Sequence, residues 1–146
     1  MCRQIQVRLS LQEPVLLLSV SRDVERIALV TDSMRAAGMP EGPSILGGLK
    51  DGQEVIVEDG VDKLLDRTSF AGSVATADRL VCTMVQVAGC SMPDAVRMIT
   101  ENPAKILGIS DRKGCLKHGM DADVVILDEN VNVKTTIVEG KVIYRV

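Results

Sequence analysis

The chain has 146 residues, which is enough for one ordinary domain with a packed core. A complete (β/α)₈ barrel needs about 250 residues and would not fit within this length. The net charge is −3, and the Lys and Arg residues are scattered, so the sequence offers no basic patch for nucleic acid. Aromatic residues make up 1% of the chain, which leaves no platform for stacking bases and predicts an aliphatic core.

An apolar run occupies residues 14–20, but it is too short to span a bilayer and its charged flanks do not suit a signal peptide. The periodicity of residues 1–22 is too weak to predict their structure. Four cysteines show neither a C-x-x-C pair nor regular spacing, namely Cys2, Cys82, Cys90 and Cys115. They are expected to be reduced, buried side chains. These features predict a cytoplasmic protein without a membrane segment.

A short apolar run over residues 27–31 ends directly at Asp32. An unbroken apolar run is typical of a strand that is buried on both faces of a parallel sheet. Because the chemistry of such sheets lies at the carboxyl ends of their strands, Asp32 is a candidate catalytic residue. Asp is also a favoured N-cap residue, so Asp32 capping a helical segment over residues 33–38 is the alternative interpretation.

Turn-forming residues dominate positions 38–60, which favours short hairpins over helices. The clearest hairpin has strands over residues 53–58 and 61–65, joined by a tight Asp-Gly turn. Residues 70–72, Phe-Ala-Gly, lie in the loop that leads to the next helix. Their main-chain amides and the Phe70 ring could bind a ligand, but a loop that leads into a helix is enough to explain these residues.

Apolar side chains recur at helical spacing over residues 77–88, which predicts an amphipathic helix. Ser91 and Asp94 have the spacing that opens a second helix, because Ser is a favoured N-cap residue and an acidic residue follows three positions later. Asn102 is expected to cap a short third turn that ends at Gly108.

After Gly114 the sequence changes to a β pattern. Residues 123–127 are typical of a buried strand, and residues 136–144 are typical of a hairpin with a Glu-Gly turn. We therefore expect a mixed α/β part followed by a small β part.

Few other reactive groups are present. The one histidine, His118, lies in a predicted loop, where a surface position is its usual role. No group of His, Cys and carboxylate residues has the spacing of a zinc site, so no metal-binding residue is predicted in this chain. Ser69 and Ser73 lack a neighbouring histidine to activate them, and Gly47 with Gly48 belongs to no phosphate-binding loop.

Several motifs resemble known signatures. Three segments are similar to the carboxyl-terminal signature of the amidohydrolase superfamily: Asn-Pro-Ala-Lys-Ile-Leu-Gly at 102–108, Lys-Gly-Cys-Leu-Lys-His-Gly-Met-Asp-Ala-Asp-Val-Val-Ile-Leu-Asp at 113–128, and Val-Glu-Gly-Lys-Val at 138–142. Two segments resemble the N-acetylglucosamine-6-phosphate deacetylase family within it: Leu-Val-Thr-Asp-Ser-Met-Arg-Ala-Ala-Gly at 29–38 and Phe-Ala-Gly-Ser at 70–73. The resemblance covers about residues 24–146.

The resemblance implies an α/β fold that contains only part of a barrel. Residues 1–113 would supply the last strand, at 27–31, and the helices of a (β/α)₈ barrel. Residues 114–146 would supply strands of a small β-sandwich domain. The barrel would therefore be incomplete within this chain.

The resemblance also implies a reaction and its residues. The family hydrolyses N-acetyl-D-glucosamine 6-phosphate to D-glucosamine 6-phosphate and acetate in amino-sugar catabolism. Asp32 would be the catalytic carboxylate, acting as general base on a metal-bound water and then as general acid to the leaving amine. Phe70, Ala71 and Gly72 would contact the sugar substrate.

In the family a divalent metal, zinc or iron, is held by a Glu and two His on earlier barrel strands, and this chain has no counterpart of them. The isolated chain is therefore expected to be inactive. The alternative is a non-catalytic interaction module that completes a barrel with another chain or self-associates. A further option is another superfamily reaction, such as hydrolysis of a cyclic amide, which the match at residues 31–38 argues against.

Overall fold

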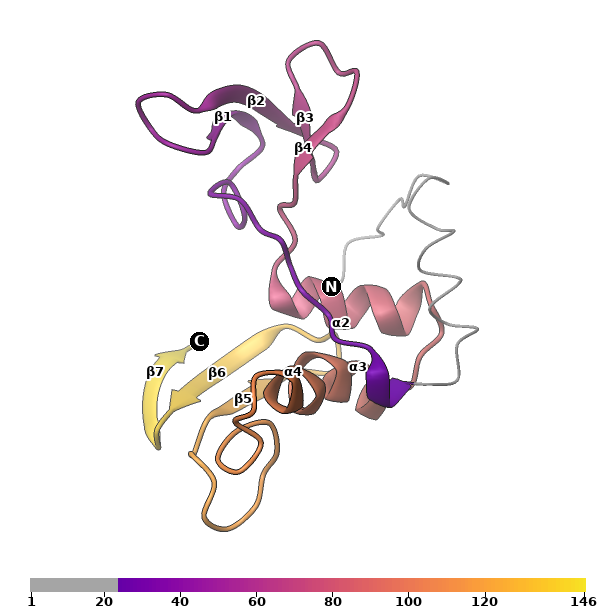
Figure 1. Cartoon of the computed structure of the whole chain (residues 1–146), viewed down its shortest axis with the longest axis vertical. Coiled ribbons are helices and arrows are strands. Elements are labelled where there is room, and N and C mark those ends of the chain that lie inside the picture. The colour runs from indigo at the N-terminus through magenta and orange to yellow at the C-terminus, as the bar shows by residue number, and fades with distance from the viewer. Residues whose placement is uncertain (1–23) are drawn as a thin grey trace. The chain divides into compact units, whose positions relative to one another are not determined.

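The computed structural model describes residues 24–146, and Figure 1 shows the elements in chain order. The chain divides into two compact units. The hairpin unit is Val30–Ala77, and the helical unit joins the segment that ends at Leu29 to Asp78–Val146. The apolar run at residues 14–20 lies outside the described residues.

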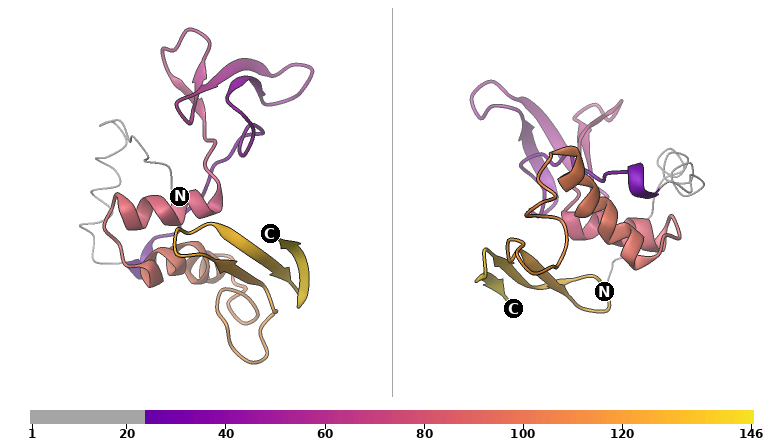
Figure 2. Two further views of the ribbon diagram at one scale, coloured as in Figure 1. Left: turned by 180° about the vertical axis from the view of Figure 1, so that it is seen from behind. Right: turned by 60° about the horizontal axis from the view of Figure 1, so that its bottom comes forward.

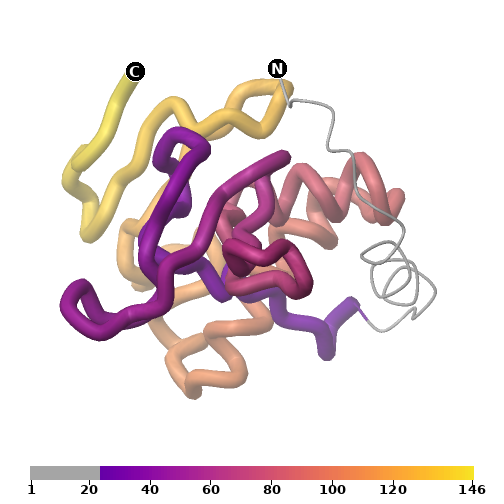
Figure 3. Tube along the Cα trace, turned by 90° about the horizontal axis from the view of Figure 1, so that it is seen from above, coloured from indigo at the N-terminus to yellow at the C-terminus, as the bar shows by residue number. Residues whose placement is uncertain are grey.

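The hairpin unit is built on a four-stranded antiparallel sheet with the order β1-β2-β3-β4, which can be followed in Figure 3. Its strands are β1 (Gly42–Leu46), β2 (Gln53–Glu58), β3 (Val61–Leu64) and β4 (Phe70–Gly72). The predicted hairpin is confirmed in β2 and β3. Asp59 and Gly60 have φ angles of 56° and 68°, as a tight two-residue turn requires.

Successive side chains of β2 point to opposite faces of the sheet, and this alternation determines which of them are buried. Val55 is 0% exposed and Val57 is 3% exposed, whereas Glu54 is exposed. Asp62 lies opposite Val57 in β3, and because paired residues share a face, its side chain is buried on the same side. The core of the hairpin unit is therefore aliphatic with one carboxyl group inside it.

The helical unit contains the 3₁₀ helix η1 (Val24–Arg26) and the helices α2 (Ala77–Gln86), α3 (Met92–Ile99) and α4 (Glu101–Ile106). The two predicted amphipathic helices are confirmed in α2 and α3. Ser91 caps α3, since its side-chain oxygen accepts a 3.3 Å hydrogen bond from the main-chain nitrogen of Asp94. The buried faces meet in one apolar cluster, formed by Val81, Cys82, Met84, Ala95, Met98 and Val131.

The predicted helix cap at Asn102 is wrong. Helix α4 begins at Glu101, so Asn102 lies within it, where it is 2% exposed. Its side-chain nitrogen donates to the carbonyl oxygens of Val24 at 2.7 Å and Ile27 at 2.6 Å. The amide therefore holds a distant segment instead of the end of its own helix.

A three-stranded antiparallel sheet completes the helical unit, with β5 (Val124–Leu127), β6 (Val133–Val138) and β7 (Lys141–Arg145) in the order β5-β6-β7. The predicted hairpin is confirmed by the pairing of Val138 with Lys141. The strand predicted at residues 123–127 is present but is not buried, since Val125 is 54% and Ile126 is 50% exposed. β5 is an edge strand, seen from two sides in Figure 2.

The strand predicted at residues 27–31 is absent. Within the described residues it makes two main-chain hydrogen bonds, from the nitrogen of Ile27 to the carbonyl oxygen of Val24 at 3.3 Å and from the nitrogen of Leu29 to that of Met98 at 2.9 Å, and Val30 is 77% exposed. A buried parallel strand needs neighbours that complete its ladder, and none lies beside this segment within residues 24–146. The observed fold is mixed α/β with two antiparallel sheets.

The cysteines are predicted to be reduced and buried, and each of the three described ones meets only one of these two expectations. Cys82 is buried as predicted, but it is disulfide-bonded. Cys90 and Cys115 are free thiols with intermediate exposure. In the part of the chain that is described, no helix is long and apolar enough to cross a membrane.

Candidate functional site

Main-chain and side-chain contacts join two segments that are far apart in the sequence. The main-chain nitrogen of Met34 donates a 2.8 Å hydrogen bond to the carbonyl oxygen of Ser73. Ser33 and Ser73 form a parallel β-bridge, and the Ser33 hydroxyl donates to the carbonyl oxygen of Ala75. We call this set of contacts the serine joint. The two segments run side by side in Figures 1 and 2.

The serine joint brings the predicted catalytic and substrate-contacting residues together. Asp32 precedes Ser33, and Gly72 precedes Ser73. Because Ser33 pairs with Ser73 in parallel, Asp32 and Gly72 occupy neighbouring positions on adjacent segments. No periodicity in the sequence signals this pairing, so the sequence analysis missed both serines as structural parts of the site.

Asp32 is exposed and has a φ of 47°, a left-handed conformation that Asp adopts more readily than most residues. Within residues 24–146 no hydrogen bond or ion pair engages its carboxylate. The alternative role as a helix cap is not supported, because residues 35–38 form a turn instead of a helix. That turn is closed by a 3.1 Å hydrogen bond from the nitrogen of Ala37 to the carbonyl oxygen of Met34.

The segment Phe70–Gly72 forms strand β4 rather than the loop that was predicted. Phe70 is 51% exposed, so about half of its ring is open to a ligand. Ala71 and Gly72 are less exposed than Phe70. β4 pairs with β3 at Asp62 opposite Gly72 and at Lys63 opposite Phe70.

Asp62 is a residue of this region that the sequence analysis missed. It is 0% exposed, and neither carboxyl oxygen has a hydrogen-bond partner of normal geometry among the described residues. Burial raises the pKa of Asp62 above its ordinary value. The tight turn at Asp59 and Gly60 could have revealed this position, because it sets Asp62 opposite the inward-facing Val57.

The described residues do not fit the metal that the resemblance implies. Within residues 24–146, no three or more His, Cys, Asp or Glu side chains gather to hold a metal ion. His118 is exposed in a turn between α4 and β5. Asp32 is therefore not part of a group of three or more such side chains in this part of the chain.

Proteins named as amino-sugar-phosphate deacetylases resemble most of the chain. N-acetylglucosamine-6-phosphate deacetylase from Danio rerio is 34% identical over 119 residues, which is 82% of this chain and 28% of that protein. A putative N-acetylgalactosamine-6-phosphate deacetylase from Escherichia coli (strain K12) is 38% identical over 117 residues, which is 80% of this chain and 67% of that protein. The chain thus spans about 28% of the length of the first of these relatives.

Solved structures show the same likeness. The crystal structure of N-acetylglucosamine-6-phosphate deacetylase from Thermotoga maritima matches with a TM-score of 0.80 and 35% identity, over 100% of this chain and 38% of that chain. An aspartate-to-alanine variant of the Mycobacterium smegmatis enzyme, in complex with N-acetyl-D-glucosamine-6-phosphate, matches with a TM-score of 0.76 and 30% identity, over 90% of this chain and 34% of that chain.

The family model for the Amidohydrolase family matches residues 16–143 of this chain. This match and the likeness to the deacetylases agree on the same assignment. The chain belongs to the amidohydrolase family.

Proposed function

We propose that this chain is the carboxyl-terminal portion of a deacetylase that hydrolyses N-acetyl-D-glucosamine 6-phosphate to D-glucosamine 6-phosphate and acetate. Asp32 would be its catalytic carboxylate, and Phe70, Ala71 and Gly72 would contact the sugar. The observation that carries the proposal is the serine joint, which sets Asp32 beside Gly72 from a distant part of the chain. The likeness to deacetylases from animals and bacteria supports it.

Asp32 would carry a proton during the reaction. An exposed carboxylate without a partner among the described residues can accept a proton from the attacking water. It can then deliver that proton to the amine nitrogen as the carbon–nitrogen bond breaks. The half-exposed ring of Phe70 offers an apolar surface to the carbon–hydrogen face of a sugar.

The structural part of the proposal concerns the missing portion of the barrel. Residues 1–113 would contribute the carboxyl-terminal part of the barrel, in which residues 27–31 would form a strand only beside the missing neighbouring strands, and residues 114–146 would contribute strands of a β-sandwich. The absence of a ladder partner for residues 27–31 in the described chain supports this view. Because the described residues do not gather metal ligands, we propose that the isolated chain is inactive.

A hybrid enzyme tests the proposed reaction. Residues 24–146 of this chain would replace the matching segment of the Thermotoga maritima deacetylase, which the whole chain resembles. Acetate release from N-acetyl-D-glucosamine 6-phosphate is expected from the hybrid. Asp32→Asn should lower kcat by about 10²–10⁴-fold, the usual contribution of general acid–base catalysis.

Three comparisons make the test decisive. A folded hybrid that releases no acetate, or whose Asp32→Asn variant keeps full activity, would contradict the proposal. N-acetyl-D-galactosamine 6-phosphate, tested in parallel, shows which epimer the site prefers, since one relative is named for that sugar. The isolated chain is assayed with added divalent metal, and acetate release that disappears in Asp32→Asn would overturn its proposed inactivity.

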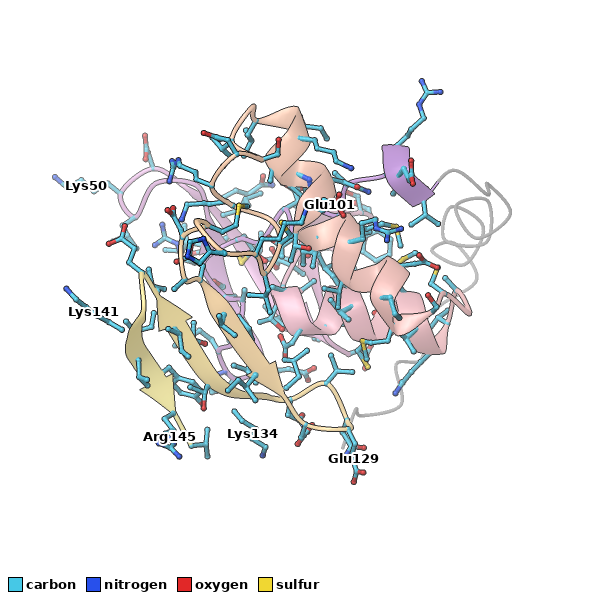
Figure 4. The ribbon with its side chains drawn as sticks, turned by 90° about the horizontal axis from the view of Figure 1, so that it is seen from below. Lys50, Glu101, Glu129, Lys134, Lys141 and Arg145 are labelled. Atoms are coloured by element: carbon cyan, nitrogen blue, oxygen red, sulfur yellow. The ribbon has the colours of Figure 1, made fainter. Side chains whose placement is uncertain are left out.

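A second candidate function is a non-catalytic interaction module. The observation that favours it is strand β7, an edge strand in which Val142 is 57%, Ile143 64% and Tyr144 50% exposed. An exposed apolar edge is a template for pairing with another chain. Figure 4 shows Lys141 and Arg145 projecting from this strand. A compact monomer in size-exclusion chromatography with light scattering would argue against self-association.

A cytoplasmic location also stays a proposal. It derives from the acidic composition and the irregular cysteine spacing, while the disulfide at Cys82 does not follow from a reduced compartment. Fractionation of cells with an antibody against the chain would test the location.

A further inference from the structure

The geometry points to a proton-controlled latch beneath the serine joint: when the buried carboxyl group of Asp62 ionises, β4 separates from β3 and from the segment that carries Asp32. The latch itself rests only on contacts within the hairpin unit. A displacement of Asp32 by the latch would matter for catalysis only through the proposed function.

The side chain of Asp62 lies in an apolar environment with no compensating partner. It is 0% exposed, and both of its oxygens lack a hydrogen bond of normal geometry within the described residues. Ionising such a group requires its charge to be stabilised by water or by a donor. The closed hairpin unit offers no water, and the effect of the Lys63 main-chain N–H is smaller than that of burial, so an ionised Asp62 favours an opened arrangement in which water reaches it.

The groups that face Asp62 are uncharged. A Cβ atom added to Gly72 would lie 3.5 Å from Oδ2 of Asp62, 3.4 Å from Cγ of Met34 and 3.6 Å from Cδ1 of Leu46. Asp62, Met34 and Leu46 therefore gather over Gly72. Met34 belongs to the serine joint through its main-chain nitrogen, so the carboxyl group and a residue of the joint both lie close to Gly72.

The remaining elements around Asp62 also bring no charge to it. β2 presents the buried side chain of Val57 to this face. The main-chain N–H of Lys63 lowers the pKa of Asp62, but burial raises it by more. The Lys63 side chain is engaged with Glu58 at 3.8 Å and Asp59 at 3.1 Å. The ionised form of Asp62 is thus the one that the closed unit disfavours.

Strand β4 is the part of the sheet that separates most readily. The ladder between β3 and β4 has two pairs, Asp62 with Gly72 and Lys63 with Phe70, with a register shift between them, and one further main-chain bond joins Leu64 to Ser69 at 3.0 Å. The β1–β2 ladder continues over every residue of β1, from Gly42 to Leu46. Local opening follows the least stable contacts, so water is expected to reach Asp62 by separation of β4 while β1 and β2 remain paired.

Hydrogen exchange at the Met34 amide, followed by NMR in the intact chain, measures the latch. Below pH 3.8, the ordinary value for Asp, Asp62 is protonated in both the closed and the opened states, and protection is greatest. As pH rises above that value, the opened state loses the proton first. The protection factor should then fall about tenfold per pH unit until Asp62 also ionises in the closed state.

Two variants and one internal reference complete the test. Asp62→Asn keeps the size of the side chain without an ionisable group, so its Met34 protection factor should not vary with pH. Glu54→Gln, which removes an exposed carboxyl group from the same sheet, should behave as the wild type does. The amides of the β1–β2 ladder should keep their protection throughout.

Three results would overturn the latch. They are a pH-independent protection factor at Met34 in the wild type, the same pH dependence in Asp62→Asn, and a simultaneous loss of protection in the β1–β2 ladder. If Asp62→Asn does not fold, the carboxyl carbon of Asp62 is titrated by NMR in the wild type, and a pKa at or below 3.8 rejects the proposal. None of these measurements uses deacetylase activity, so an inactive hybrid and a failed latch are distinguishable.

Discussion

The side-chain nitrogen of Asn102 donates a 2.6 Å hydrogen bond to the carbonyl oxygen of Ile27, five residues before Asp32 in the sequence. The same nitrogen donates to the carbonyl oxygen of Val24 at 2.7 Å. One buried side chain of α4 therefore holds the segment through which the chain approaches the candidate catalytic residue. This segment has no strand partner among the described residues, so these two bonds act together with the Leu29–Met98 main-chain bond and the packing of Val24, Ile27 and Leu29 against the apolar cluster.

Asn102→Ala is expected to lower the free energy of unfolding of the helical unit by about 2–3 kcal/mol, because two carbonyl oxygens lose their donor and a small cavity forms. Urea unfolding followed by circular dichroism of the helices measures the loss. Asn102→Asp is the matched control, since it keeps the shape but cannot donate both bonds. It should be at least as destabilising, and wild-type stability in this variant would show that packing, not hydrogen bonding, is the cause.

Local patterns predicted the elements that depend on local physics. The Ser91 and Asp94 pair marked the start of α3, and the Asp-Gly turn marked the β2–β3 hairpin. The role of Asn102 was not predictable, because its acceptors are 75 and 78 residues away along the chain. The strand expected at residues 27–31 was wrong because an apolar run becomes a strand only where neighbours complete its ladder.

The residues of the candidate site also divide into those that local sequence patterns predict and those that depend on distant contacts. Asp32 stands out by its position after an apolar run, while the sequence around Phe70 is explained as well by entry into a helix, and only the family resemblance favours a substrate contact there. The pairing of Ser33 with Ser73 is non-local and leaves no signal in the spacing of residues. Asp62 was predictable in principle, since strand alternation from the turn places it opposite Val57.

Gly52→Ala is expected to destabilise the hairpin unit by about 1–3 kcal/mol, the usual cost of overpacking. A Cβ atom at Gly52 would collide with the carbonyl oxygens of Gly48 and Leu46 and with Cγ2 of Ile45. Gly48→Ala is the matched control, because its Cβ atom would meet only the side chain of Asp51, which can rotate away. Hydrogen exchange of the β1–β2 ladder measures both variants, and equal losses would show that the collision is not the cause.

Asp128 should make the helical unit sensitive to acid. Its Oδ1 atom accepts 2.9 Å hydrogen bonds from the main-chain nitrogens of Asn130 and Asn132, and the side chain of Asn132 donates to its Oδ2 atom at 2.9 Å. These bonds, led by the Asn132 side chain, hold the pKa of Asp128 well below its ordinary 3.8. A lowered pKa means that the carboxylate stabilises the fold above pH 3.8 and loses this effect as pH falls through the lowered value.

The Tm of the wild type, measured by circular dichroism, is therefore expected to fall as the solution is acidified below pH 3.8. Asp128→Asn should have a lower Tm at neutral pH and a weaker dependence on acid, because it removes the charge that these donors stabilise. Glu129→Gln is the control, since Glu129 projects from the same loop in Figure 4. An acid dependence of Asp128→Asn equal to that of the wild type would assign the effect to other carboxylates.

Phe70→Ala should separate substrate contact from stability in the hybrid enzyme. The ring is 51% exposed, so its removal is expected to leave the unfolding midpoint nearly unchanged, while the sugar loses an apolar surface. KM should rise about tenfold, equivalent to about 1.4 kcal/mol of binding free energy, with kcat almost constant, because the ring would bind substrate and transition state alike. Phe70→Leu retains part of that surface, so its KM should lie between those of the wild type and Phe70→Ala. A fall in kcat at unchanged KM would instead indicate that β4 positions the reacting groups, and the proposed contact between Phe70 and the sugar would be wrong.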